Sequence, residues 1–218
     1  SRESRICIFE YIYFARPDSV IDGVSVHAAR QRAGAALSQT HPVSADVVVG
    51  VPDSGLDAAI GYSQASGIPY GIGLIKNKYI GRTFIMPTQA LREKGVKMKL
   101  SPVRSIVKGK RVVLVDDSIV RGTTSLKIVK MLREAGAAEV HVRIASAPLK
   151  YTCYYGVDVH TPEELISNKN SVDQVCRIIE ADSLAFLSHE GMLAAGHRND
   201  LCLACFNHKY PTKLYTEE

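Results

Sequence analysis

One segment, residues 112–125, carries residue types that suit a phosphorylated sugar. It reads VVLVDDSIVRGTTS: a β-branched apolar run, the acids Asp116 and Asp117, then a glycine and three hydroxyl residues. The stretch from Gly122 to Ser125 offers free backbone N–H groups where a helix begins, and the helix dipole favours an anion there. Two carboxylates beside a phosphate would repel it unless they accept hydrogen bonds from sugar hydroxyls or hold Mg²⁺. The segment therefore indicates a site for a sugar phosphate and a metal ion.

Simpler interpretations of these residues explain less of the pattern. Asp116 and Asp117 could be exposed acids at the end of a strand, with Thr123 an ordinary helix N-cap. A Walker-type phosphate loop is excluded because the G-x-x-x-x-G-K-[ST] pattern is absent. Gly71 and Gly73 lack the third glycine of a dinucleotide-binding fingerprint. The combined strand, acids and glycine–hydroxyl turn favours the sugar-phosphate site.

Two further segments could complete such a site. VPDSG at residues 51–55 links a β-branched run to a helical pattern, so its N–H groups also suit an anion. Taken alone, it reads as a generic turn with Asp53 or Ser54 as N-cap. Residues 76–110 have little apolar periodicity, and long stretches of this kind in compact domains are functional or mobile loops. We expect the latter segment to be a lid.

The elements that would position these residues alternate between strands and helices. The patterns predict three core strands and two core helices, the strands at 46–52, 111–117 and 139–145 and the helices at 54–62 and 123–135. Outside this core they predict a strand at 7–14 and helices at 24–38, 161–179 and 188–195. Strands separated by helices form parallel sheets with helices on both faces, and their ligands lie at the carboxyl ends of the strands. The sequence thus predicts an α/β fold.

Composition is that of an ordinary globular protein. The 218 residues are 46% hydrophobic and 22% charged, with 27 basic against 22 acidic residues. The excess of +5 suits a phosphorylated small molecule as well as nucleic acid, but there is no Trp to stack bases. No apolar run approaches the ~18 residues needed to span a bilayer, and no signal-peptide core is present. We expect one cytoplasmic domain over residues 1–218, with its core at about 20–160 and no membrane partner.

The cysteines indicate metal binding. There are five, Cys7, Cys153, Cys176, Cys202 and Cys205. Cys202-x-x-Cys205 is half of a metal site, and Cys7 and Cys153 are candidates for the other half. Four thiolates satisfy a structural Zn²⁺ or an iron–sulfur cluster, so spacing leaves both open. Cys176 is expected to be a small buried apolar residue.

Residues 112–124 resemble the phosphoribosyl pyrophosphate (PRPP) motif of the type I phosphoribosyltransferases. The continuation SIVRGTT resembles the glutamine PRPP amidotransferase family, in its iron–sulfur, Bacillus-like branch, as do CIFEYIYFARPDS at 7–19, CLACF at 202–206 and KYPT at 209–212. The resemblance implies the type I phosphoribosyltransferase fold: a mainly parallel twisted sheet with helices on both faces, a flexible lid loop and a C-terminal helical extension. It implies formation of 5-phosphoribosylamine and pyrophosphate from PRPP and ammonia, the first committed step of purine (IMP) biosynthesis.

The resemblance also implies roles for single residues. Asp116 and Asp117 would hold the ribose hydroxyls and Mg²⁺, with Ser54 as a third metal ligand. The other PRPP-binding residues would be Asp53, Gly55, Arg121, Gly122, Thr123, Thr124 and Ser125. The catalytic residues would be Lys76, Tyr79 and Arg82 on the loop, whose cations would stabilise the departing pyrophosphate while closure excludes water. Cys7, Cys153, Cys202 and Cys205 would hold a structural [4Fe-4S] cluster joining the N-terminal strand to the C-terminal tail, with Zn²⁺ as the alternative.

Partners follow from the same resemblance. They are PRPP, ammonia, purine nucleotide feedback inhibitors and further copies of the chain, but no nucleic acid; part of the basic stretch 92–111 could contact nucleotide phosphate. We expect the family's N-terminal glutaminase domain to be absent and Cys7 to be a poor candidate for its nucleophile, and therefore expect use of free ammonia unless a separate glutaminase domain or chain supplies it. A nucleobase phosphoribosyltransferase and a non-catalytic PRPP sensor are the alternatives.

Overall fold

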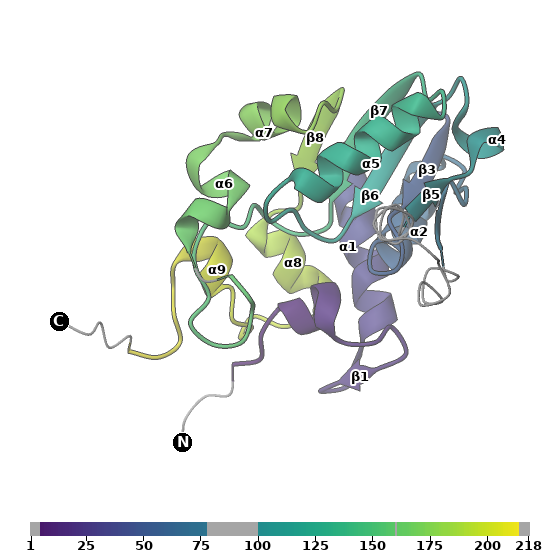
Figure 1. The fold of residues 1–218 in the computed structure, drawn as a ribbon. Coiled ribbons are helices and arrows are strands. Elements are labelled where there is room, and N and C mark those ends of the chain that lie inside the picture. Colours follow the sequence, from purple (N-terminus) through teal and green to yellow (C-terminus); the bar gives the residue numbers. More distant parts are fainter. Residues whose placement is uncertain (1–4, 78–99, 160, 214–218) are drawn as a thin grey trace, which may run out of the picture.

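A four-stranded parallel sheet forms the centre of the molecule (Figure 1). The computed structural model describes residues 5–77, 100–159 and 161–213. The strand order is β3-β6-β7-β8, with bounds Val47–Gly50, Arg111–Asp116, Glu139–Ile144 and Ser183–Phe186. All three pairings are parallel. The strands predicted at 46–52, 111–117 and 139–145 are confirmed, whereas β8 was not predicted and extends the sheet beyond residue 160.

Helices cover both faces of this sheet because its strands are apolar on both sides. Val48, Val113 and Val115 pack with helices α1 (Val26–Thr40), α2 (Leu56–Ser66) and α8 (His189–Ala195). Val49 and Leu114 pack on the opposite face with α5 (Thr123–Glu134) and α7 (Val172–Ile178). In Figure 1, α5 lies over β6 and β7. Alternate residues of a strand point to opposite faces, so these runs are buried on both sides, as the α/β prediction requires.

Two small antiparallel pairs lie outside the central sheet. β1 (Val20–Ile21) pairs with β2 (Val24–Ser25), and β4 (Leu74–Lys76) pairs with β5 (Leu100–Pro102). The short helix α4 (Arg104–Val107) follows β5. The predicted lid, 76–110, therefore has ordered ends, whereas Tyr79 and Arg82 lie outside the described residues. No helix in the described ranges is long and apolar enough to cross a membrane.

The strand predicted at 7–14 is wrong. Residues Glu10–Phe14 form a π-helix, η1, and only Cys7 makes an isolated bridge, parallel to Cys202. Ile8, Tyr11 and Ile12 are buried while Tyr13 is exposed, which is a helical and not an alternating pattern. Short apolar runs of this kind fit both the helical and the strand period, and here packing against α1 favours the helix.

The helix predicted over 161–179 is also broken. It consists of a 3₁₀ turn η3 (Pro162–Glu164), the short α6 (Ile166–Lys169) and α7. Ser171 starts α7 through a capping box with Gln174, so its own backbone is extended and no continuous helix can pass through it. A last helix, α9 (Ala204–Asn207), contains Cys205.

Helices α1 and α2 approach each other at two glycines. A Cβ at Gly34 would lie 1.8 Å from the carbonyl oxygen of Ala58, and one at Gly61 would lie 1.9 Å from that of Gln31. Both obstacles are backbone atoms within helices, so neither can rotate away as a side chain could. The contact fixes how α1 lies against α2, and α2 begins directly after the turn at 51–55.

We expect Gly34→Ala to lower the free energy of unfolding by ~3 kcal/mol, because the added methyl group forces the two helices apart. Urea denaturation followed by circular dichroism measures this. Gly156→Ala is the matched control, since a Cβ there meets nothing within 4 Å, and its effect should stay within ~0.5 kcal/mol. Equal stabilities of the two variants would show that the helix contact is not tight.

Candidate functional site

The acid pair lies where two parallel strands end. Asp116 is the last residue of β6 and Asp117 follows it, 7% exposed. One Asp117 carboxylate oxygen accepts a hydrogen bond from Ser54 Oγ and the other from Ser118 Oγ. Ser54 lies in the turn after β3, the neighbour of β6. The carboxyl ends of the two strands thus bring together residues 63 positions apart, as the sheet geometry predicts.

Burial disfavours the charged form of both carboxyl groups. Burial raises the pKa of Asp116, and the neighbouring charge of Asp117 raises it further, against a hydrogen bond that Asp117 N donates to Asp116 Oδ1 at 2.9 Å. Burial also raises the pKa of Asp117, while the hydroxyls of Ser118 and Ser54 and the charge of Arg30 lower it. A buried acid next to a half-buried one, both with raised pKa values, favours a bound cation.

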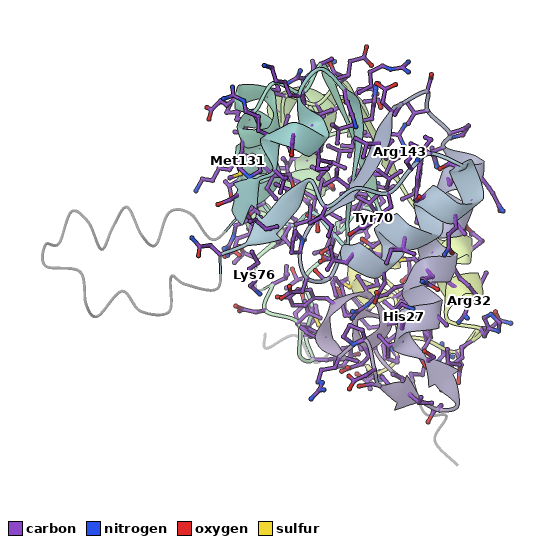
Figure 2. All side chains as sticks on the ribbon, turned by 90° about the vertical axis from the view of Figure 1, so that its right-hand side faces the viewer. His27, Arg32, Tyr70, Lys76, Met131 and Arg143 are labelled. Atoms are coloured by element: carbon purple, nitrogen blue, oxygen red, sulfur yellow. The ribbon has the colours of Figure 1, made fainter. Side chains whose placement is uncertain are left out.

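The turn after β3 is shaped for close backbone approach. A Cβ at Gly55 would lie 2.6 Å from the carbonyl oxygen of Val115, so only glycine fits between the two strands. The peptide bond between Pro52 and Asp53 is cis. Asp53 is exposed, and its Oδ2 accepts a hydrogen bond of 2.6 Å from Lys76 Nζ. Lys76 lies on β4 and is labelled in Figure 2. The turn therefore presents Asp53 to solvent, where Lys76 of β4 meets it, and Ser54 to Asp117.

The glycine–hydroxyl turn leads into α5. Gly122, the N-cap, has φ +76°, and a Cβ there would meet Ile166 at 2.6 Å, so this position requires glycine. The first helical bond runs from Leu126 N to Gly122 O, which leaves the N–H groups of residues 123–125 without intrahelical partners. Arg121, before the turn, pairs with Glu164. The start of α5 has the free donors that an anion needs.

A known protein family contains this arrangement of two turns and an acid pair. The family model described as "Phosphoribosyl transferase domain" matches residues 25–175, which contain both strand-end turns, the acid pair and the start of α5. The chain belongs to the phosphoribosyltransferase family. Its fold agrees, with a parallel sheet covered by helices on both faces.

Curated relatives of this phosphoribosyltransferase share one name. This chain is 61% identical over 218 residues to the amidophosphoribosyltransferase of Bacillus subtilis (strain 168), and the alignment covers 97% of this chain and 46% of the relative. It is 56% identical to that of Archaeoglobus fulgidus, over 100% of this chain and 49% of the relative. The chain spans about half the length of the curated relatives it matches.

A solved structure agrees with these sequence comparisons. It is described as glutamine PRPP amidotransferase from B. subtilis complexed with ADP and GMP. The TM-score is 0.89 at 60% identity, covering 98% of this chain and 48% of that one. The type I phosphoribosyltransferase fold predicted from the sequence is therefore confirmed.

The phosphoribosyltransferase also gathers four of its five cysteines. Cys7, Cys153, Cys202 and Cys205 line one cavity of about 1590 Å³. Ile8 N donates to Cys202 O at 3.2 Å, and Cys202 N donates to Ile6 O at 2.8 Å, so the N-terminal segment lies beside the C-terminal one. Lys150 N and Tyr151 N both donate to Cys205 O, which brings the Cys153 loop to the same place. Three distant segments meet at this cavity.

The sulfur atoms influence one another electrostatically. Burial raises the pKa of Cys7 to about 11, and Cys202 and Cys153 contribute to the rise. Burial raises the pKa of Cys205 as well, followed by the charges of the other three cysteines. Cys153 Sγ accepts hydrogen bonds from Tyr155 N and Val157 N, both at 3.4 Å. Within the described ranges, however, no three His, Cys, Asp or Glu residues form a group that could hold a metal ion.

The fifth cysteine lies elsewhere. Cys176, on α7, is half-buried and its Sγ donates to Ala181 O at 3.3 Å. It does not line the cavity of the other four. The prediction that it stands apart from the metal ligands agrees with this placement, although it is less buried than expected.

Three residues of the site were not predicted from the sequence. Ser118 donates to Asp117, and Glu164 pairs with Arg121. Arg30 lies in the middle of α1 and is 5% exposed. Ser118 could have been found from its position beside the acids, whereas nothing in the sequence around Glu164 or Arg30 distinguishes them from surface residues.

The basic stretch at 92–111 is only partly described. Arg104 Nε donates to Ala135 O at 3.3 Å, and Arg111 forms an ion pair with Asp46 at 2.8 Å. Both residues thus connect elements of the fold to one another. Residues 92–99 lie outside the described ranges.

Proposed function

We propose that this chain is the transferase part of an amidophosphoribosyltransferase, which forms 5-phosphoribosylamine and pyrophosphate from PRPP and ammonia in purine biosynthesis. The observation that carries the proposal is the contact of Ser54 with the buried Asp117, because it joins two anion-binding turns around one acid pair. The relatives share the name amidophosphoribosyltransferase. That name supports ammonia derived from an amide as the acceptor of the phosphoribosyl group.

In this proposal each turn holds one part of PRPP. The N–H groups and hydroxyls of Gly122, Thr123, Thr124 and Ser125, with Arg121, bind the 5-phosphate at the start of α5. Asp116 and Asp117 accept hydrogen bonds from the ribose hydroxyls. Asp53, Ser54 and Gly55 surround the pyrophosphate.

Mg²⁺ fits the same residues. Ser54, Asp116 and Asp117 provide hydroxyl and carboxylate oxygens, the donors that Mg²⁺ prefers, and burial raises the pKa of both acids, so a bound cation would stabilise their charged forms. When bound, the ion would stabilise negative charge on the departing pyrophosphate. The three residues bind and orient the substrate whether or not they share the ion.

Lys76, Tyr79 and Arg82 are proposed as the catalytic residues of the loop. Lys76 already faces Asp53 in the pyrophosphate turn. Negative charge that develops on the leaving group beside this turn is stabilised by a cation in the same position. Closure of the loop would exclude water, which competes with ammonia for the sugar.

We expect Lys76→Met to lower kcat about 30-fold, because it removes one cation from the leaving group. Stability should change by less than ~0.5 kcal/mol, since exposed ion pairs such as Lys76–Asp53 contribute little. Steady-state kinetics with PRPP and ammonium measure the first effect and thermal unfolding the second. Lys127→Met, an exposed lysine on α5, is the control and should keep the wild-type rate. Wild-type kcat in Lys76→Met would remove this lysine from the mechanism.

A [4Fe-4S] cluster held by Cys7, Cys153, Cys202 and Cys205 is part of the proposal. The donor set fits, because all four thiols line one cavity. Four thiolates would also satisfy a structural Zn²⁺, so the choice of the iron–sulfur cluster over zinc rests on the resemblance of the cysteine segments to the iron–sulfur branch of the family. The role proposed for it is structural, since the cavity joins three chain segments.

The remaining partners are proposed from the relatives. Purine nucleotides are expected to inhibit, as the complex of the B. subtilis enzyme with ADP and GMP suggests. A glutaminase domain or chain would supply ammonia, which accords with relatives about twice as long. Assembly into homo-oligomers and a cytoplasmic location stay predictions.

Pyrophosphate release from PRPP with Mg²⁺ tests the function. The acceptors to compare are ammonium, glutamine, and a panel of free purine and pyrimidine bases. We expect turnover with ammonium and not with bases. Turnover with a base alone would identify a nucleobase phosphoribosyltransferase, and PRPP binding without pyrophosphate release would identify a sensor.

A further inference from the structure

Arg30 is a buried cation between η1 and the acid pair. Its Nε donates to Tyr11 O at 2.8 Å and its Nη2 to Ala15 O at 2.9 Å, so two of its three nitrogens are occupied by carbonyls of the N-terminal segment. In the described part of the chain it forms no direct ion pair with a carboxylate. A buried guanidinium without a paired charge is costly, and its retention inside the core calls for a compensating group.

A small cavity connects Arg30 to the proposed substrate site. Its volume is about 20 Å³, and its polar lining includes Arg30, Ser54 and Asp117. Apolar side chains such as Ile8, Ile12 and Met192 complete the wall. A volume above ~10–15 Å³ holds one water molecule, provided that two to four polar groups surround it. The guanidinium, the carboxylate and the hydroxyl meet that condition.

The charges are also complementary. The Arg30 cation lowers the pKa of Asp117 against the effect of burial. Conversely, burial lowers the pKa of Arg30, while Asp57 and Asp117 raise it. Asp57 has a second partner, because its Oδ1 lies 3.0 Å from His27 Nδ1. Asp117 lines the small cavity beside Arg30, whereas Asp57 does not line it, so Asp117 is the acid that faces Arg30 within the site.

We propose that Arg30 is a positioning residue that holds the Asp117 carboxylate through one buried water molecule. The inference rests on the proposed function, in which Asp117 binds the ribose of PRPP. Ser54 and Ser118 hold the carboxylate from the solvent-facing turns, and Arg30 holds it from the core. Without the cation the carboxylate keeps its two hydroxyl donors but loses its third fixed contact, so PRPP binds more weakly.

Two variants separate charge from packing. Arg30→Lys keeps a cation, Arg30→Gln does not, and both lose part of the bonding to Tyr11 and Ala15. We expect Arg30→Gln to raise the KM for PRPP about tenfold at saturating Mg²⁺ and ammonium, with kcat changed less than about threefold. Arg30→Lys should restore KM to within about threefold of wild type. Equal KM values for the two variants would overturn the proposal.

Arg32→Gln is the matched control. Arg32 lies on the same helix, its Nε donates to Ala195 O at 2.8 Å, and burial alone lowers its pKa. Figure 2 shows it on the side of the molecule away from Lys76. We expect a wild-type KM for PRPP from this variant. A rise in this KM equal to that of Arg30→Gln would mean that the loss of any side-chain hydrogen bond from α1 weakens substrate binding, and the proposal would be wrong.

A crystal structure of the wild-type chain at high resolution gives a test that needs no variant. We expect an ordered water within hydrogen-bond distance of both Arg30 and Asp117, and its absence would overturn the proposal even if the variants fail to fold. Wild-type pyrophosphate release tests the proposed function separately. If the wild-type chain releases no pyrophosphate, Arg30→Lys and Arg30→Gln are compared by calorimetric titration with PRPP and Mg²⁺. Equal dissociation constants for PRPP in the two variants again overturn the role of Arg30.

Discussion

Asp117→Asn is expected to lower kcat/KM for PRPP by at least about 100-fold while the protein stays as stable as wild type. A hydrogen bond to a charged group contributes ~1.5–3 kcal/mol, and the variant weakens two ribose contacts and any shared Mg²⁺. Two such contacts correspond to a loss of 100-fold or more at 1.36 kcal/mol per tenfold change. Stability should change little, because the unfavourable burial of this carboxylate, which raises its pKa, offsets the loss of its charge opposite Arg30.

The contrast between activity and stability is what makes this variant informative. Asp182→Asn is the matched control, because Asp182 Oδ2 accepts hydrogen bonds from Val140 N at 2.6 Å and from Arg133 at 2.9 Å. It should lose stability and keep its kcat/KM, the reverse of Asp117→Asn. Steady-state kinetics and urea denaturation on both variants decide the matter. If Asp117→Asn retained more than about a tenth of kcat/KM, Asp117 would hold neither ribose nor metal.

The local part of this site could be predicted from sequence. Residues 112–125 contain a strand, the acid pair, the glycine turn and the start of α5 without interruption, so one segment defines most of the geometry. The meeting of Ser54 with Asp117 also follows, because parallel strands place their carboxyl ends at one edge of a sheet. These features depend on short-range patterns and on one topological rule.

The parts that depend on packing between distant segments could not be predicted. Arg30 is followed in α1 by the polar Gln31 and Arg32, so the sequence does not mark it as buried. Its partners are the backbone carbonyls of Tyr11 and Ala15, which no side-chain pattern reveals. The apolar run that contains Tyr11 fits a strand and a helix equally well. Burial against α1 selects the helical form, so the error in η1 and the omission of Arg30 have one cause.

The same limit applies to the edge of the sheet. β8 has four residues, Ser183–Phe186, between two helices, and so short a run carries little periodicity. Its assignment depends on pairing with β7, for which His141 aligns with Ser183. β3 is also an outer strand of four residues, but its valine run is buried throughout, whereas β8 is only partly buried. The sequence therefore predicts the uniformly apolar strands better than β8.

We expect Cys205→Ser to abolish cluster assembly, with iron and sulfide falling from about four of each per chain toward none. Cys205 is 5% exposed and its thiol lies among Cys7, Cys153 and Cys202, whose charges raise its pKa. Burial raises the pKa of Cys7 and Cys205, so their thiols are protonated without a metal, and bound iron would replace those protons because the thiolate is the ligand form. Serine keeps the volume but not the soft thiolate donor that iron–sulfur clusters require.

The measurement is an iron and acid-labile sulfide assay on anaerobically purified protein, together with thermal unfolding. Metal binding adds to folding free energy, so Cys205→Ser should also unfold at a lower temperature. Cys176→Ser, a cysteine outside the cavity, should keep wild-type iron, sulfide and stability. Zinc without sulfide in the wild type would contradict the cluster directly. Wild-type iron in Cys205→Ser would instead show that the four cysteines meet for a reason other than cluster binding.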